Sequence, residues 1–330
     1  MDESAARRLI RRAFTLCLLV TTFAALLALS PLLLLVAAVA DIAQRARFTA
    51  VRALLMVLAY LACEVAGVLA AAALWLRGGG DERFLEGNFR LQWWWCNALF
   101  TAARALFGLS VEVTGAECAR GGPVLVLARH VSVGDTILAA ALLSRPYGLR
   151  LRYVLKRELL WDPCLDIVGR RIPNAFVRRG SRDTAGDLAA VRKLAQSLGE
   201  RDGVMIFPEG TRASPRLRAR AIERLEASAA VTPEQLAAAR RLTHLLPPRV
   251  EGVLALLEED PRPDVVFLAH EGFDRVRTLA DLRRGGLVGQ RIRVRVWRCV
   301  RAEIPDDREG RIRWLSSQWQ SMDEWVGSAG

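Results

Sequence analysis

Two long apolar stretches dominate the first quarter of the chain. From Ala13 to Ala40 there is no charged residue, whereas roughly 20 apolar residues suffice to cross a hydrocarbon core about 30 Å thick. A second stretch of membrane length runs from Ala53 to Leu76 and is interrupted by one charged residue, Glu64. Because the first stretch is longer than one span needs, we expect it to tilt, kink or split, and Pro31 is placed where a break would help.

The two stretches predict a membrane anchor of two helices over residues 1–80. A cleaved signal peptide is the competing interpretation, but the apolar segment is too long for one and a second follows it. A carboxylate at bilayer depth costs on the order of 3 kcal/mol, so we expect Glu64 to face the partner helix or to stay protonated. Arginines flank both ends of the pair, and two full spans and a hairpin in one leaflet both remain open.

The next segment, residues 81–110, is predicted to be an interfacial linker helix. Gly78-Gly79-Gly80 marks the boundary before it, since glycine runs interrupt regular structure. Trp93-Trp94-Trp95 begins an apolar, weakly basic stretch, and indole rings favour the headgroup level of a bilayer. Packing of these tryptophans in a protein core is the alternative interpretation.

From residue 111 to residue 330 short β-rich runs alternate with helical stretches. This alternation predicts one α/β domain with a mostly parallel sheet. The predicted strands are Val124–Ala128, Arg152–Leu155, Ala175–Arg178, Val204–Phe207, Val265–Ala269 and Ile292–Val300. The predicted helices are Asp135–Leu143, Thr184–Leu198, Leu217–Ala229, Pro233–Leu242, Val250–Glu258 and Arg311–Val326.

Composition narrows the range of partners. The 330 residues are 52% hydrophobic with a formal net charge of +12, and arginine carries almost all of the positive charge, since Lys156 and Lys193 are the only lysines. Such a balance favours polyanions, namely phospholipid headgroups, nucleic acid or phosphorylated substrates. The six cysteines are scattered without a C-x-x-C pair, so neither a disulfide framework nor a zinc site is indicated.

The most informative polar run is Arg129–Thr136, which follows a predicted strand and leads into a predicted helix. It holds His130 and Asp135. Histidine is the usual general base near neutral pH and works best when a carboxylate fixes its tautomer. The sequence therefore predicts a catalytic pair at the carboxyl end of a strand, where α/β sheets bind ligands. In the alternative interpretation Ser132 and Asp135 only form a helix capping box. His270, which ends another predicted strand, is a weaker rival for the base.

A second run, Phe207–Arg212, follows another apolar strand. Gly210 allows the backbone to approach a ligand closely, and Arg212 suits bidentate contact with a phosphate. A plain turn at the end of a strand is the alternative. The arginine-rich stretch that follows, residues 212–241, is interpreted either as a solvated helical face or as a contact with anionic lipid.

These runs resemble the motifs of the glycerolipid acyltransferase family, which contains the 1-acylglycerol-3-phosphate acyltransferases. The signatures N-H-x-S-x-x-D and F-P-E-G-T-R correspond to Arg129–Asp135 and to an unbroken Phe207–Arg212. Ala175–Arg179 is similar to the second motif, and Leu246–Gly252 looks like the P-R-x-x-G form of the fourth. All four occur in the family's order within residues 111–300. Arg129 departs from the family pattern, because asparagine is usual there.

The resemblance implies a membrane-bound acyltransferase with a glycerolipid-acyltransferase-like α/β domain on the cytoplasmic face. By this resemblance His130 is the base that activates the hydroxyl of a lysophospholipid, most simply 1-acylglycerol-3-phosphate, and Asp135 orients its ring. The acyl donor is acyl-CoA or acyl-carrier protein, with no metal and no other cofactor. The residues implied to hold the acceptor are Arg179, Glu209, Gly210, Thr211 and Arg212.

Three alternatives stay open. A related acyltransferase would act on another acceptor, such as lysophosphatidylinositol, a glycolipid or an ornithine lipid. An inactive relative would serve as a membrane scaffold, against which the intact His130, Asp135 and Glu209 argue. A membrane-tethered nucleic-acid binder would explain the charge, with salt-sensitive binding as its signature, but it would not explain the motifs, and no nucleic-acid partner is expected.

Overall fold

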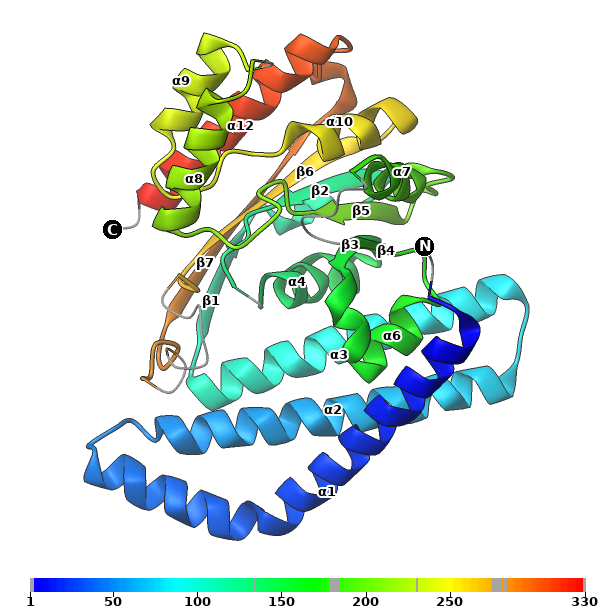
Figure 1. Cartoon of the computed structure of the whole chain (residues 1–330), viewed down its shortest axis with the longest axis vertical. Helices are drawn as coiled ribbons and strands as arrows, with labels where there is room; N and C mark the ends of the chain where they lie inside the picture. The colour runs from blue at the N-terminus through cyan, green and yellow to red at the C-terminus, as the bar shows by residue number, and fades with distance from the viewer. Residues whose placement is uncertain are drawn as a thin grey trace. The chain divides into compact units, whose positions relative to one another are not determined.

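The structure is a computed structural model that describes residues 3–132, 134–177, 184–229, 231–274, 281 and 284–328. The chain divides into two compact units that interleave along the sequence (Figure 1). Unit 1 comprises Met1–Ser110, Leu155–Arg178 and Thr278–Arg291, and unit 2 comprises Val111–Val154, Arg179–Arg277 and Ile292–Gly330. The sequence placed all residues from 111 onward in one domain, whereas two of these segments pack with the N-terminal helices.

Unit 1 is mainly helical. Its regular elements are α1 (Ala5–Ala43), α2 (Thr49–Arg77), α3 (Asp81–Phe107), a 3₁₀ turn (Arg157–Trp161), α6 (Pro163–Gly169) and the short strand β4 (Ala175–Val177). The long helices α1, α2 and α3 pack in chain order, α1 on α2 and α2 on α3. The first apolar stretch does not split, because α1 continues through Pro31.

The surfaces of α1 and α2 are unusually apolar. Both helices are long and apolar enough to cross a membrane, and no residue in the most apolar window of α1 is buried. Leu18, Leu32 and Leu35 on α1 and Leu69 and Trp75 on α2 are among the exposed large side chains. A continuous apolar surface of this kind is unfavourable in water and is typical of a membrane or partner contact.

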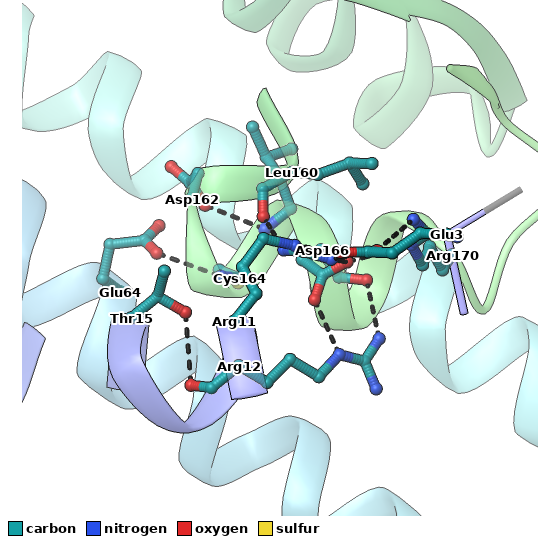
Figure 2. Close-up of polar contacts among 11 residues, drawn as sticks. Glu3, Arg11, Arg12, Thr15, Glu64, Leu160, Asp162, Cys164, Asp166 and Arg170 are labelled. Carbon is teal, nitrogen blue, oxygen red and sulfur yellow. Dashed lines mark hydrogen bonds and ion pairs between the residues drawn. The ribbon is translucent and has the colours of Figure 1, made fainter. Parts of the chain in front are cut away.

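Glu64, the lone carboxylate of α2, is fully satisfied inside unit 1. It is 1% exposed. It accepts hydrogen bonds from the indole Nε1 of Trp95 at 2.8 Å and from the backbone amide of Cys164 at 3.1 Å. Glu64 therefore ties α2 to both α3 and α6, and Figure 2 shows its carboxylate pointing to Cys164. Of the three consecutive tryptophans, Trp95 is buried and Trp94 is exposed. One therefore packs in the core, as the alternative interpretation expected, and another lies on the surface.

A buried ion cluster joins the N-terminus of α1 to α6 (Figure 2). The carboxylate of Asp166 is 1% exposed and pairs with Arg11 at 3.1 Å, Arg12 at 2.6 Å and Arg170 at 2.9 Å. Glu3 adds a second carboxylate, 2.9 Å from Arg11. Because Arg11 and Arg12 each have a carboxylate partner, this part of the basic start of the chain belongs to the structure of unit 1.

Unit 2 contains the main sheet. Its strands are β1 (Ser110–Thr114), β2 (Val124–Ala128), β3 (Arg150–Lys156), β5 (Asp202–Ile206), β6 (Asp264–Glu271) and β7 (Arg291–Cys299). They lie side by side in the order β1-β7-β6-β2-β5-β3. The central pairs β2 with β5, β2 with β6 and β3 with β5 are parallel, and β6 with β7 is antiparallel. The predicted α/β class with a mostly parallel sheet is confirmed.

The pattern of side chains explains which strands are central. Every residue of β2 and of β5 is buried, as expected for parallel strands covered on both faces. In β3 buried and partly exposed residues alternate, which is typical of a strand with one covered face. The strand β1 was not predicted: Val111 and Val113 alternate with polar residues, but the run is five residues long and mostly exposed.

The described helices of unit 2 follow the predicted ones closely. They are α4 (Gly134–Ala139) with a π-helical turn (Ala140–Ser144), α5 (Arg145–Tyr147), α7 (Thr184–Ala195), α8 (Pro215–Glu226), α9 (Pro233–Arg241), α10 (Val250–Glu259) and α12 (Arg308–Gly327). Local signals fix several ends. For example, Thr232 and Gln235 form a complete capping box at α9, with Pro233 in the first turn. The arginine-rich stretch is thus mainly the helix pair α8 and α9, which pack on each other (Figure 1).

Candidate active site

His130 lies where the chain leaves the central strand β2, and Asp135 lies in the first turn of α4. The ring Nδ1 of His130 is 3.0 Å from Oδ2 of Asp135. His130 is 9% exposed and Asp135 is 1% exposed. In the described part of the chain no protein group is hydrogen-bonded to the second ring nitrogen, Nε2. With Nδ1–H donating to the carboxylate, Nε2 carries the lone pair of a neutral imidazole.

Asp135 also organises the turn that follows the histidine. Its Oδ2 accepts the backbone amides of Val131 at 2.6 Å and Ser132 at 2.9 Å, and its Oδ1 accepts the hydroxyl of Ser132 at 2.6 Å. The hydroxyl of Ser132 in turn accepts the amide of Gly134 at 3.1 Å. The interpretation of Asp135 as a capping residue is therefore compatible with its contact to His130, because one carboxylate makes both sets of bonds.

Glu209 connects the two sequence runs. Since β2 and β5 are parallel neighbours with Leu127 opposite Ile206, the residues after both strands meet at the same edge of the sheet. The backbone amide of His130 donates to Oε1 of Glu209 at 2.9 Å. The amide of Leu246 donates to Oε2 at 3.3 Å. Glu209 is 2% exposed. Its two hydrogen bonds join the loop after β5 to the turn after β2 and to the fourth motif. A contact of Glu209 with substrate remains a prediction.

His270 and Arg129 form a polar layer beneath this turn. His270 has no exposed surface, and its Nε2 lies 3.2 Å from the carbonyl oxygen of Arg129 and 3.4 Å from Oδ1 of Asp135. The guanidinium of Arg129 donates to the carbonyl oxygen of His270 at 2.7 Å and forms an ion pair with Asp274 at 2.5 Å. Arginine in place of the usual asparagine thus ties the β2 turn to the end of β6.

The loop after β5 has the predicted special geometry. Gly210 has φ +66°, and a Cβ there would lie 2.8 Å from Nε of Arg249. Thr211 is half-buried and Arg212 is exposed. His130 stacks on Phe207, with ring centroids 4.4 Å apart. Arg179, the remaining predicted acceptor residue, lies outside the described residues.

Burial and charge affect the acidic groups of the site in opposite ways. Burial alone would raise the pKa of Asp135, but the nearby charge of His270 and the hydrogen bond from His130 outweigh it, and the pKa lies below its ordinary value. Burial raises the pKa of Glu209 to about 8, against the opposing effects of the His130 amide and the charge of Arg129. Asp135 is thus kept ionised beside an imidazole, as a residue that orients a general base requires.

Sequence reasoning found His130, Asp135 and Glu209, and the structure brings these three together. It missed the link between His270 and Asp135. The sequence showed only that His270, like His130, follows a predicted strand; the pairing of Ala128 of β2 with Leu268 of β6, which places residues 130 and 270 at the same level of the sheet, came from the structure.

Comparisons with known proteins identify an acyltransferase domain. Residues 110–244 match the family model described as Acyltransferase. The chain is 30% identical over 122 residues to 1-acyl-sn-glycerol-3-phosphate acyltransferase of Pseudomonas aeruginosa, which is 36% of this chain and 44% of that protein. The chain therefore spans less than half of the length of this relative.

A solved structure shows the fold. The 1-acyl-sn-glycerophosphate acyltransferase PlsC of Thermotoga maritima superposes with a TM-score of 0.57 over 86% of this chain and 99% of that chain, at 15% sequence identity. Residues 110–244 are thus an acyltransferase domain, and the family match, the relative and the shared fold support the resemblance to the glycerolipid acyltransferase family.

Proposed function

We propose that this protein is a membrane-bound enzyme that transfers an acyl group from acyl-CoA or acyl-carrier protein to the free hydroxyl of a lysophospholipid. The acceptor we propose is 1-acylglycerol-3-phosphate, and the product is phosphatidic acid. The observation that carries the proposal is the 3.0 Å contact of His130 with Asp135 at the carboxyl end of β2. It leaves one ring nitrogen with a lone pair that no described protein group occupies.

The reaction follows from that nitrogen. Nε2 of His130 removes the proton of the acceptor hydroxyl, whose oxygen attacks the carbonyl carbon of the thioester. A carbon–oxygen bond forms, the carbon–sulfur bond breaks, and the leaving thiolate takes the proton back from Nε2. Asp135 keeps the ring in the required tautomer and stabilises the imidazolium. No covalent acyl-enzyme is needed.

The acceptor is held, in this proposal, by the loop after β5. Gly210, Thr211 and Arg212 supply a backbone that can be approached closely, a hydroxyl and a guanidinium suited to phosphate. Glu209 supports that loop and the amide of His130 together. Arg179 completes the predicted set.

The membrane assignment rests on the exposed apolar surfaces of α1 and α2. With such a hairpin in the bilayer, we place the α/β domain on the cytoplasmic face, where a water-soluble thioester donor is available. The lipid acceptor is then supplied from the bilayer itself.

The test is product formation by full-length protein in detergent, with 1-acylglycerol-3-phosphate and long-chain acyl-CoA, followed by mass spectrometry. Phosphatidic acid is expected from the unmutated protein and from His244→Ala, which removes an exposed histidine, but not from His130→Ala. Product from another lysolipid alone would correct the acceptor. Undiminished activity of His130→Ala would refute the mechanism.

A further inference from the structure

Unit 2 contains a cleft whose walls combine residues of the third and fourth sequence motifs with helices that carry no motif. It has a volume of about 580 Å³ and is lined by residues of α8, α9, the start of α10 and α12, together with Glu209 and Thr211. This volume lies within the range of about 300–1,000 Å³ typical of small-molecule sites. We call it the α8–α9 cleft, after the arginine-rich helix pair that forms one side of it.

The interior of the α8–α9 cleft is mainly carbon. Leu225 of α8, Ala238 of α9, Leu242 and Trp319 of α12 line it. Trp319 has no exposed surface, and its indole N–H already donates to the carbonyl oxygen of Leu246 at 2.9 Å. These walls suit a hydrocarbon chain, while a few hydroxyl and amide side chains add polar groups to the lining.

Two arginines of the cleft carry positive charge with no acidic partner. Arg224 and Arg249 both line the cleft and are both exposed. Burial and the charge of Arg224 lower the pKa of Arg249, as expected for two like charges that line one cleft. Among the described residues no carboxylate forms an ion pair with either. In contrast, the third arginine of the lining, Arg308, is paired with Glu251 at 2.5 Å.

The cleft adjoins the catalytic pair. Glu209 lines it, and the other face of the same carboxylate accepts the amide of His130. The Arg249 side chain lies against Gly210 of the predicted acceptor loop. A ligand whose charged group lies at Arg249 is therefore beside that loop.

We propose that the α8–α9 cleft binds a single-chain phospholipid, with its phosphate between Arg224 and Arg249 and its hydrocarbon chain in the interior. Two guanidinium groups match a phosphate in charge and in bidentate geometry. The apolar part of the lining suits a single hydrocarbon chain. That this lipid is the acyl acceptor rests on the proposed function, but its binding can be measured without turnover.

The first test measures equilibrium binding to the immobilised full-length protein without acyl donor. The probes are radiolabelled 1-acylglycerol-3-phosphate, the corresponding monoacylglycerol, which lacks the phosphate, and glycerol-3-phosphate, which lacks the chain. Arg224→Gln and Arg249→Gln are each expected to raise Kd for the phospholipid roughly tenfold, the loss typical of one charge-assisted hydrogen bond. Neither is expected to change Kd for monoacylglycerol. Arg220→Gln is the matched control, since Arg220 lies on α8 outside the cleft lining.

A second pair of variants tests the chain site. Ala238→Trp fills the cleft and is expected to raise Kd for both lipids at least tenfold while leaving glycerol-3-phosphate unaffected. Ala237→Trp, on the exposed side of the same helix, is the control and should bind as the unmutated protein does. A thermal unfolding curve for each variant separates loss of the site from loss of the fold.

Three outcomes overturn the proposal: phospholipid binding that no cleft variant changes, equal binding of all three probes, or displacement from the cleft by acyl-CoA but not by phospholipid. Acyl transfer distinguishes this failure from failure of the proposed function. If the cleft variants transfer acyl groups with an unchanged KM for the acceptor, the lipid site in the cleft is refuted and the proposed function is not. Cleft-dependent binding without transfer refutes the proposed reaction and leaves the lipid site in place.

Discussion

Nε2 of His270 lies 3.4 Å from Oδ1 of Asp135, the carboxylate whose Oδ2 is hydrogen-bonded to His130. One buried carboxylate therefore serves two histidines on neighbouring parallel strands. His270 has no exposed surface and His130 is partly exposed, so a substrate can reach only His130 of these two. We therefore expect His270 to act by positioning Asp135 and not as the base, because its burial gives a substrate no access to it.

Asp135→Asn is expected to lower kcat by roughly 10²- to 10⁴-fold, the range of general base catalysis, with little change in KM. The amide oxygen can take the place of Oδ2 and still accept from Nδ1, but an uncharged amide no longer stabilises the imidazolium that forms. Steady-state kinetics of Asp135→Asn, of His130→Ala and of the double variant that carries both changes check this. Because the two residues act as a unit, the double variant should lose no more than His130→Ala alone, and a multiplied loss would separate their roles.

His270 predicts a dependence of stability on pH. Burial lowers the pKa of His270, although the charge of Asp135 opposes this. Below the unfolded pKa of about 6.5 the unfolded chain binds a proton that the folded chain does not, so stability falls with falling pH, by up to about 1.4 kcal/mol per unit.

His270→Gln, whose amide can still donate to the carbonyl oxygen of Arg129, should remove this contribution. Unfolding midpoints in detergent between about pH 5 and pH 8 give the comparison, with His244→Gln as the control for loss of an exposed histidine. An identical pH slope in His270→Gln and the unmutated protein would contradict the assignment.

Glu209 predicts the opposite trend. Burial raises the pKa of Glu209 from 4.5 to about 8. Between these values the folded chain binds the extra proton, so stability falls as pH rises through this window. Glu209→Gln stays uncharged and should lose this slope, which the difference between the unfolding curves of variant and parent measures. The idea fails if the difference does not vary with pH.

The Arg129 and Asp274 pair should be asymmetric. Asp274→Ala leaves a buried guanidinium without its charge partner and is expected to cost about 3–5 kcal/mol. Arg129→Met costs less, because the Asp274 side chain is 35% exposed and water can solvate it. The double variant should be more stable than Asp274→Ala, as measured by chemical unfolding. Simple additivity of the two losses would show that the residues are not coupled.

Asp166 should matter far more to stability than a surface carboxylate. Asp166→Asn removes the charge that three arginines share, and we expect a loss of about 3–5 kcal/mol, as for a broken buried pair. Glu226→Gln breaks the exposed pair with Arg240 and should cost at most about 1 kcal/mol. Similar thermal shifts for the two variants would argue against a structural role of the cluster.

Local signals were sufficient for most elements of the fold. All the predicted strands and helices occur within a few residues of their expected limits, because apolar periodicity, caps and turn residues act over short distances. Ends were less certain. The helix predicted over Asp135–Leu143 changes to a π-helical turn at Ala140, and β1, a run of five residues that contains two valines, was not predicted.

The sequence by itself determined the α/β class, the apolar N-terminal helices and the pairing of His130 with Asp135, since these depend on residues close together in the chain. Tertiary structure alone decided that Glu64 meets Trp95 and Cys164, that Asp135 also contacts His270, and that α8, α9 and α12 enclose a cleft. These contacts join segments that are 31 to 135 positions apart, and only the packing of helices and the register of parallel strands brings them together. No local pattern encodes such a register, because it depends on which surfaces the whole chain buries at once.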